Sequence, residues 1–308
     1  MYSVVIPLYN KEKYIEKCIN SLVVSADTAD ILVEFIIVND CSTDTSLFVA
    51  SSIKDQRVRI IDLVENQGPS NARNIGVANA TFENIYFIDA DDLVDKQFFS
   101  ILNDKKFLEK EFVCVDICRF NSHNSIPTLE YQHKEVDVID LPTLSYHKFL
   151  SEGKELFTAS SVIIRKDVFI ELGGFSLESN FTEDAEFWAR LSFKCCGIYV
   201  PLILSYYRMV QNSLSHDFFY NFNEVPILLK TLLIQRGNSN SPLIYGAANS
   251  MMLKYLFISR ASNRTIFNKL RNITREIDLS IKVKLVSSVL LLFPSDVIKI
   301  IFKLLRRG

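Results

Sequence analysis

The sequence lacks the cysteine patterns that build zinc sites and disulfide-rich scaffolds. Its six cysteines do not form paired C-x-x-C units, and the adjacent Cys195 and Cys196 would make a poor tetrahedral zinc chelator. We therefore expect reduced thiols that serve mostly as packing residues of a cytosolic protein.

Three further signals are missing. No G-x-G-x-x-G or GxxxxGK[ST] follows a strand-like segment, which disfavours dehydrogenases and P-loop enzymes. The net charge of -2 provides no global basic field, so nucleic acid is not an expected partner. The N-terminus opens with SVVIPLYN and has neither the basic region nor the cleavage site of a signal peptide, which predicts a cytoplasmic location.

What is present predicts an α/β fold. The 308 residues, 48% of them apolar, can support a sizeable core. A β-branched run at 3–6 predicts a buried strand, and residues 14–23 have helical spacing after Asn10, a good N-cap. Strand-like runs follow at 35–38, 57–63 and 85–88, with a helix beginning at Ser70. This alternation predicts βαβ units and a mostly parallel central sheet with flanking helices.

The second half of the chain is less regular. Strand-like runs at 112–119 and 160–164 enclose a polar excursion, after which 183–193 reads as a helix and 199–207 as a strand. From about Asn221 the strand signals disappear. We predict a catalytic domain at 1–220 and a helical C-terminal region at 221–308.

Acidic and polar side chains gather where the predicted parallel strands end, the edge at which open sheets bind ligands. Pro7-Leu8-Tyr9-Asn10, Asn39-Asp40 and Asp89-Ala90-Asp91-Asp92 occupy these positions. Carboxylates brought together need an offsetting cation, and oxygen ligands suit Mg²⁺ or Mn²⁺. Taken alone, however, Asp40 could be a turn or cap residue and the acidic run a solvated turn.

Arg73 lies in the first turns of the helix that follows Gly68-Pro69, next to the positive end of the helix dipole. That position disfavours a cation, and a nearby anion would resolve the conflict. An ordinary surface arginine is the alternative.

Five ordered segments carry a family resemblance: SVVIPLYNKEKYIEKCINSL, EFIIVNDCSTDTS, NQGPSNARNIGVANA, IYFIDADD and TEDAEFWARL. In this order and spacing they resemble the family 2 inverting glycosyltransferases of GT-A fold, over roughly the first 215 residues. The resemblance implies transfer of a sugar from a nucleotide diphosphate, UDP by default, to a hydroxyl of a glycan or lipid-linked saccharide, and a role in cell-surface polysaccharide synthesis.

The resemblance also implies roles for residues of the donor site. Pro7 and Tyr9 would line the nucleoside pocket, and Asp40 would bind the base. Asp40 is the last acidic residue of a V-D-D-G-S pattern that here reads Val38-Asn39-Asp40-Cys41-Ser42, with cysteine at the usual glycine. Asp89-Ala90-Asp91 matches the family's DxD: Asp89 would contact the ribose or the metal shell, and Asp91 would bind Mn²⁺ or Mg²⁺. Arg73 would lie near the donor's phosphates or sugar.

Acceptor-side residues follow from the same comparison. Glu183-Asp184 matches the family's E-D pair, with Asp184 as the general base and Glu183 at the acceptor; without the ordered motifs, Asp184 would be read as a carboxylate that complements a helix dipole. Trp188 could stack on an acceptor sugar or simply pack in the core. Val210 stands where the family often has a metal-binding histidine, and either nearby His216 or water would complete the shell.

The C-terminal region contains an apolar stretch at 285–293, then a basic apolar stretch at 297–305, and neither reaches the roughly 20 residues needed to span a bilayer. These features predict helices that lie on the inner face of the cytoplasmic membrane, or an oligomer or domain contact. A sugar nucleotidyltransferase and a catalytically silent, membrane-associated glycan-binding protein are the rival functions. A nucleotidyltransferase should carry a Gly-rich loop after the first strand. A silent binding protein would not need the four aspartates Asp40, Asp89, Asp91 and Asp184.

Overall fold

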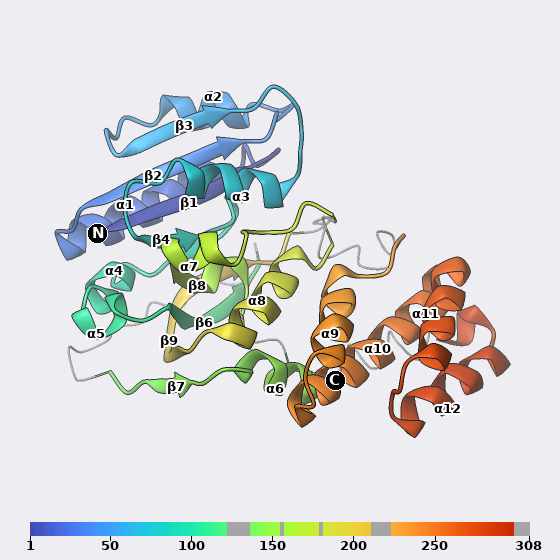
Figure 1. The fold of residues 1–308 in the computed structure, drawn as a ribbon. Helices are drawn as coiled ribbons and strands as arrows, with labels where there is room; N and C mark the ends of the chain where they lie inside the picture. The colour runs from blue at the N-terminus through green and yellow to red at the C-terminus, as the bar shows by residue number, and fades with distance from the viewer. Residues whose placement is uncertain (122–135, 155–156, 179–180, 211–222, 299–308) are drawn as a thin grey trace. The chain divides into compact units, whose positions relative to one another are not determined.

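The computed structural model describes residues 1–121, 136–154, 157–178, 181–210 and 223–298, which form two compact units (Figure 1). Unit 1 comprises the described parts of Met1–Thr143, Phe157–Phe187 and Lys194–Val210. Unit 2 comprises those of Leu144–Leu156, Trp188–Phe193 and Gln211–Gly308. The expected boundary near 221 stays a prediction.

Unit 1 is built on a nine-stranded sheet in the order β3-β2-β1-β4-β8-β6-β9-β5, with β7 also paired to β9. The first four of these strands run parallel, as do β6 and β9, whereas β8, β5 and β7 join antiparallel. The α/β fold with a largely parallel central sheet is confirmed. The strands are β1 (Tyr2–Leu8), β2 (Val33–Asn39), β3 (Val58–Asp62), β4 (Asn84–Phe87), β5 (Leu93–Val94), β6 (Phe112–Phe120), β7 (Ile139–Leu141), β8 (Val162–Arg165) and β9 (Gly197–Arg208).

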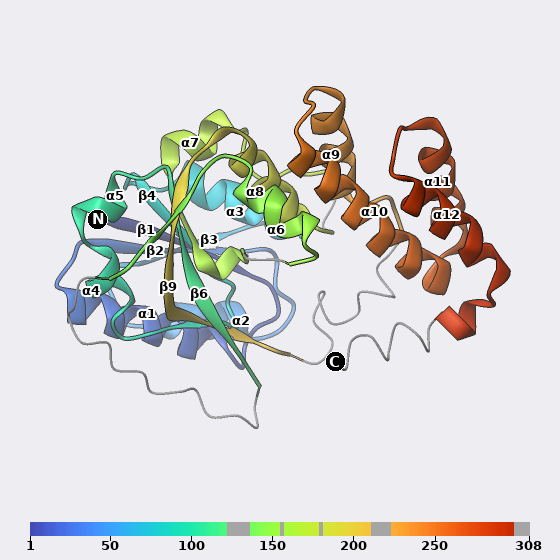
Figure 2. The same cartoon turned by 90° about the horizontal axis from the view of Figure 1, so that it is seen from below.

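Helices cover both faces of the sheet. They are α1 (Ile15–Ala29), α2 (Ser46–Ser52), α3 (Pro69–Ala78), α4 (Phe98–Leu102), α5 (Lys105–Leu108), α7 (Lys166–Glu171), the 3₁₀ turn η1 (Ala159–Ser161) and α8 (Glu183–Lys194), whose residues are shared between the units. Figure 2 shows α1 and α2 on one side of the sheet and α3 and α7 on the other. Alternation along β1 explains this: Val4 and Ile6 join the core cluster that includes Ile15 of α1, while Val5 faces Gly76 of α3.

Pro7 lies in the central strand β1, where a residue without an N–H would normally break the ladder. The carbonyl of Val5 accepts from the Ile88 N–H, whereas the carbonyl of Leu8 accepts from Asp40 on the opposite side. Alternate residues of a strand face the same neighbour, so the Pro7 nitrogen faces the β4 side. Strand β4 has already ended there, and no ladder bond is lost.

The prediction that Asn10 caps the first helix is wrong. Tyr14 is the residue before α1, and Asn10 has a left-handed backbone with a φ of 51°. Its side-chain oxygen accepts from the backbone N–H of Thr43 at 2.8 Å. Asn10 therefore joins the loop after β1 to the loop after β2.

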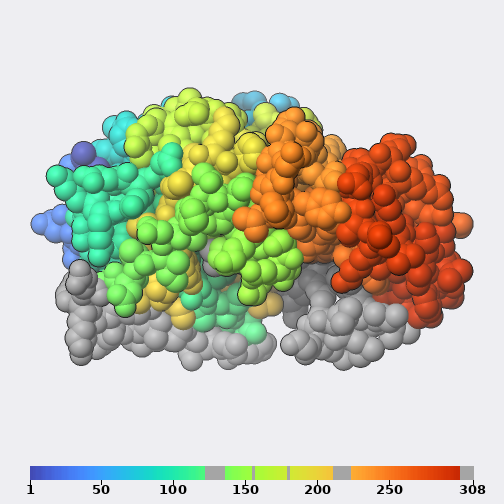
Figure 3. All heavy atoms as spheres, turned by 60° about the horizontal axis from the view of Figure 1, so that its bottom comes forward, coloured from blue at the N-terminus to red at the C-terminus, as the bar shows by residue number. Residues whose placement is uncertain are grey.

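Unit 2 is helical. It holds α6 (Ser145–Ser151), α9 (Ile227–Gly237), α10 (Pro242–Ser262), α11 (Arg264–Glu276), α12 (Ile281–Val289) and the 3₁₀ turn η2 (Leu290–Leu292). The atoms of α6 lie against those of the α9–α10 segment (Figure 3), and the buried His147 Nε2 lies 2.8 Å from Gln235 Oε1. Within the described ranges, every helix is too short or too polar to cross a bilayer.

Candidate active site at the carboxyl ends of the parallel strands

The loops that follow β1 and β2 are tied together by hydrogen bonds. Besides the Asn10 contact, the Lys11 N–H donates to Ser46 Oγ at 2.7 Å, and the Thr45 N–H donates to Glu12 at 3.0 Å. These bonds fix the backbone of Lys11 at the edge of the sheet. The acidic residues after β4 lie at the same edge, because β1 and β4 are parallel neighbours.

Asp40 organises the loop before α3. It is almost fully buried, and its two carboxylate oxygens accept from the backbone N–H groups of Gln67 and Gly68, each at 2.8 Å. Asn66 Nδ2 also donates to the Asp40 carbonyl at 3.0 Å. Asp40 thereby holds the start of the helix that carries Arg73.

Two departures from the V-D-D-G-S pattern have structural explanations. Asn39 Nδ2 donates to Asp62 Oδ1 at 2.6 Å, a bond that an ionised aspartate at position 39 could not donate. Cys41 has a φ of 57°, the left-handed region that favours glycine. The turn therefore keeps the backbone conformation that suits the glycine of the family pattern, and Cys41 is strained in that conformation.

The acidic run after β4 is partly buried. Asp89 keeps a side-chain exposure of 33%, Asp91 only 11%, and Ala90 packs into the core. The loss of water raises the pKa of Asp91, and the charge of Asp89 adds to that shift, although Lys11, in contact with Asp91 Oδ2, opposes it. This cluster strongly favours a nearby cation.

Asp92 is buried deeper and has a structural position. It accepts from Ser160 Oγ at 2.6 Å and from the Arg208 N–H at 2.8 Å. Burial, together with Asp89 and Asp91, raises the pKa of Asp92 well above its usual value. Ser160 Oγ also accepts from the Asp89 N–H at 3.1 Å, so η1 and β9 together hold the acidic loop in place.

Arg73 connects the acidic loop to α8. It is 4% exposed, and its guanidinium donates to Asp89 Oδ1 at 2.7 Å and to Glu183 Oε1 at 3.3 Å. Burial alone would lower the pKa of Arg73, but the charges of Asp89 and Glu183 outweigh it and raise that pKa. The guanidinium also lies 5.4 Å from the centre of the Phe175 ring. The anions expected near Arg73 are these two carboxylates.

Glu183 and Asp184 begin α8. Burial, followed by repulsion from Asp184, raises the pKa of Glu183 to about 7, even though Arg73 lowers it. Asp184 Oδ1 accepts from the Ala185 N–H at 2.7 Å. Arg73 thus brings Asp89 and the Glu183-Asp184 pair, which are far apart in sequence, into one site.

The other predicted residues are placed as follows. Tyr9 is exposed at the end of β1, and Pro7 is half-buried in it. Trp188 is fully buried, which agrees with a role in core packing. Its stacking on an acceptor sugar stays a prediction. His216 lies outside the described residues.

The family model of glycosyl transferase family 2 matches residues 3–173, more than half of the chain. The chain belongs to glycosyl transferase family 2. The resemblance seen in its five motifs is confirmed at the level of the family.

Relatives of this family 2 chain include a poly(ribitol-phosphate) β-N-acetylglucosaminyltransferase, TarS, of Staphylococcus aureus. It is 35% identical over 98 residues, which are 31% of this chain and only 17% of TarS. An uncharacterized glycosyltransferase of Haemophilus influenzae is 27% identical over 86% of this chain and 83% of its own length.

Solved structures support the GT-A fold. Residues 1–349 of S. aureus TarS in complex with UDP-GlcNAc align with a TM-score of 0.58 at 17% identity, covering 88% of this chain and 83% of that one. A mannosyltransferase of Pyrobaculum calidifontis in complex with GDP-Man and Mn²⁺ aligns with a TM-score of 0.57 at 14% identity, covering 95% and 80%. At these identities the likeness concerns the fold alone.

The described side chains at this edge offer a divalent ion few ligands of their own. In the described part of the chain, no three Asp, Glu, His or Cys side chains are arranged as a metal site. Asp91 and Asp89 nevertheless fit Mg²⁺ or Mn²⁺, because such ions are commonly held by one or two carboxylates plus the oxygens of a substrate phosphate. The pKa of Asp91, raised by burial and by Asp89, fits a place for a cation.

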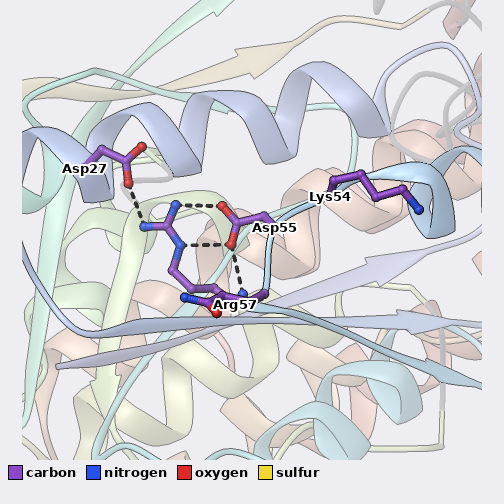
Figure 4. Close-up of a pocket in the computed structure, with 5 residues that line it drawn as sticks. Asp27, Lys54, Asp55 and Arg57 are labelled. Carbon is purple, nitrogen blue, oxygen red and sulfur yellow. Dashed lines mark hydrogen bonds and ion pairs between the residues drawn. The ribbon is translucent and has the colours of Figure 1, made fainter.

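A hollow of about 430 Å³ lies away from this edge. Asp27, Lys54, Asp55, Gln56 and Arg57 line it at the start of β3 (Figure 4). Arg57 binds Asp55 and Asp27, both at 2.7 Å, so its guanidinium already has two carboxylate partners within the protein. The chemistry of the family motifs is at the opposite end of the strands.

Sequence reasoning missed three residues of the candidate site: Lys11, Ser160 and Arg208. Arg208 Nε donates to the Asp91 carbonyl at 2.7 Å, and its guanidinium lies 4.4 Å from the Phe120 ring centre. The signal available for Arg208 was its place in the family's Y-R-x-H pattern, which here reads Tyr207-Arg208-Met209-Val210. Nothing in the local sequence distinguished Lys11 from its neighbour Lys13.

Proposed function

We propose that the chain is an inverting glycosyltransferase that moves a sugar from a nucleotide diphosphate, UDP by default, to a hydroxyl of a glycan or lipid-linked saccharide in cell-surface polysaccharide synthesis. The ion-pair chain Asp89–Arg73–Glu183 carries this proposal. It supports one site in which the DxD loop and the start of α8 act on the same substrate. TarS, named for transfer of N-acetylglucosamine to poly(ribitol-phosphate), supports the acceptor class.

In this proposal the donor lies across the carboxyl ends of β1, β2 and β4. Pro7 and Tyr9 line the nucleoside pocket, Asp40 binds the base through the acceptor capacity left on its carboxylate, and Ala90 lies beside the nucleotide. Arg73, which already neutralises Asp89, stands beside the diphosphate or the sugar. Asp91, assisted by Asp89, holds Mn²⁺ or Mg²⁺ against the phosphates.

A bound divalent ion would supply charge neutralisation at the leaving diphosphate. Asp184 would take the proton of the acceptor hydroxyl as that oxygen attacks the anomeric carbon. Glu183 and Trp188 are assigned to the acceptor side. A single displacement of this kind inverts the configuration at the anomeric carbon.

Binding and turnover of sugar nucleotides test this proposal. With Mn²⁺ present, we expect one of the UDP, GDP or dTDP sugars to raise the melting temperature, because a ligand selective for the folded state stabilises it. Slow hydrolysis of the same donor should follow. Asp91→Asn should abolish both effects, whereas the exposed Asp278→Asn should retain them. Donor binding without any turnover would favour a catalytically silent protein, and pyrophosphorolysis would favour a nucleotidyltransferase.

We further propose that unit 2 contacts an anionic membrane surface. Ile281, Leu285 and Val289 recur at helical spacing on α12 and are 47–76% exposed, while Val283 and Ser287 face inward. At 100° per residue, Lys282 and Lys284 lie on either side of this apolar stripe, the arrangement of an interfacial helix. Arg260 Nε donates to the Leu290 carbonyl at 2.9 Å and supports the end of the stripe.

Liposome flotation tests the membrane contact. The full chain should float with vesicles that contain anionic lipid and much less with neutral ones. Leu285→Glu should reduce flotation several-fold, whereas Leu177→Glu, at an exposed apolar position of unit 1, should not. Equal flotation of the two variants would leave an oligomer or domain contact as the role of this face.

A further inference from the structure

The ammonium group of Lys11 contacts the carboxylate of Asp91, the residue predicted to bind metal. Its Nζ contacts Asp91 Oδ2, and the two side chains are 26% and 11% exposed. The charge of Lys11 lies where an ion bound to Asp91 would place its own charge. No family motif assigns this residue a role.

The backbone around Lys11 is fixed on both sides. Its N–H donates to Ser46 Oγ at 2.7 Å, and its carbonyl accepts from Tyr14 at 2.9 Å and from Ile15 at 3.0 Å. The side chain, a flexible four-carbon stem, is the part that can move. Lys11 also stands just before α1, where the positive end of the helix disfavours a cation, so the contact with Asp91 offsets an unfavourable position.

A divalent ion and an ammonium cannot share Asp91 without cost. A ligand oxygen lies about 2.0–2.2 Å from Mg²⁺ or Mn²⁺, which leaves like charges a few ångströms apart in a partly buried site. Arg208 takes no part in this competition, because its Nε binds the Asp91 carbonyl and not the carboxylate. Although Lys11 contacts only Oδ2 of Asp91, we therefore expect an incoming ion to displace its ammonium.

We propose that Lys11 is a resident counter-ion of Asp91 that competes with the divalent metal, and that it couples metal binding to donor binding. Without donor, the metal has to break the Lys11–Asp91 pair. With donor, the diphosphate offers the released ammonium a new anionic partner. This inference rests on the proposed function, because it takes Asp91 as the metal ligand.

The coupling has a definite thermodynamic sign. If the diphosphate helps to remove Lys11 from Asp91, it raises the affinity for metal, and metal raises the affinity for UDP by the same factor. Phosphate oxygens also bind the metal directly, so some coupling is independent of Lys11. Replacing Lys11 should therefore reduce the coupling and not remove it.

The test measures Mn²⁺ affinity by the loss of the free-ion paramagnetic resonance signal, with and without UDP, so it does not depend on activity. Lys11→Met should bind Mn²⁺ without UDP about tenfold more tightly than wild type, the factor expected for about 1.4 kcal/mol. UDP should improve that affinity less in this variant than in wild type. Lys13→Met, which removes the same charge from an exposed position two residues away, should match wild type.

Other outcomes would overturn the proposal in distinguishable ways. Equal or weaker Mn²⁺ binding by Lys11→Met would remove Lys11 from this role and leave the metal site intact. No Mn²⁺ binding by any variant, even with UDP, would overturn both the metal site and the role of Lys11. Thermal melting of both variants checks that they are folded.

Discussion

Arg73 and Asp89 form a 2.7 Å ion pair in which the arginine side chain is 5% exposed and the aspartate 33%. The pair therefore reaches from the interior toward solvent. Its buried end also binds Glu183. This geometry makes Arg73 the residue on which the arrangement of the site depends, and it leads to the first prediction.

Above pH 7, where Glu183 is ionised, Arg73→Met should destabilise the protein by about 3–5 kcal/mol, because it leaves this buried carboxylate without its counter-ion. Urea denaturation measures this loss. Arg59→Met, at a half-exposed arginine of the same unit, should cost about 1 kcal/mol or less. Equal losses in the two variants would mean that the Arg73 pairs contribute no more than a surface contact.

Asp184→Asn should lower the rate of glycosyl transfer about 10²–10⁴-fold, the range for loss of a general base. Donor affinity, measured by calorimetry, should change little. If Glu183→Gln instead causes the larger loss of rate, the base is Glu183. Asp27→Asn, at an exposed aspartate, serves as the control.

Glu183 makes stability depend on pH in a defined direction. Its folded-state pKa of about 7 lies above the ordinary 4.5, so the folded state holds this proton more tightly than the unfolded state does. Its stabilising contribution is complete below pH 4.5 and is lost as the pH rises through about 7. Relative to wild type, Glu183→Gln should therefore gain about 1–3 kcal/mol between these limits.

The measurement is the free energy of unfolding of both proteins at a series of pH values. Glu65→Gln, at an exposed position, should show a difference from wild type that does not vary with pH. A constant difference for Glu183→Gln as well would contradict the raised pKa.

Gly76→Ala should destabilise the packing of α3 on β1, because a Cβ at this position would lie 2.3 Å from Val5 Cγ1. We expect a cost of about 1–3 kcal/mol from overpacking. Combining it with Val5→Ala removes the overlap, so the double variant should lose less than the sum of the single losses. Gly237→Ala, with open space around it, should be nearly neutral. Additive losses at Gly76 and Val5 would contradict the close contact.

Cys41→Gly should stabilise the protein by about 0.5–1 kcal/mol, because glycine adopts a φ of 57° without the penalty of an L side chain. Cys41→Ala keeps the left-handed strain and removes only the thiol, so it is the matched control. Calorimetric melting compares the two variants. A gain that is the same in both would assign the effect to the thiol.

Local patterns were sufficient for most of unit 1. The apolar run at 3–6 is part of β1, and the predicted helix at 183–193 is α8 within a residue or two. Both predictions succeed because a buried strand and an amphipathic helix are recognised from the pattern of neighbouring residues. The same reliance on neighbouring residues explains why the predicted helix cap at Asn10 is wrong. Capping chemistry is a local preference, whereas Thr43, the group that binds Asn10, is brought there by the pairing of β1 with β2.

The sequence by itself determined the family, the alternation of strands and helices, and which carboxylates end neighbouring strands. Only the tertiary structure decided which partners these carboxylates bind. Arg73 binds Asp89 and Glu183, Lys11 contacts Asp91, and Ser160 donates a hydrogen bond to Asp92. The physical reason is distance along the chain. Electrostatic and hydrogen-bond energies depend on separations of a few ångströms between residues 16 to 110 positions apart, and the fold sets those separations.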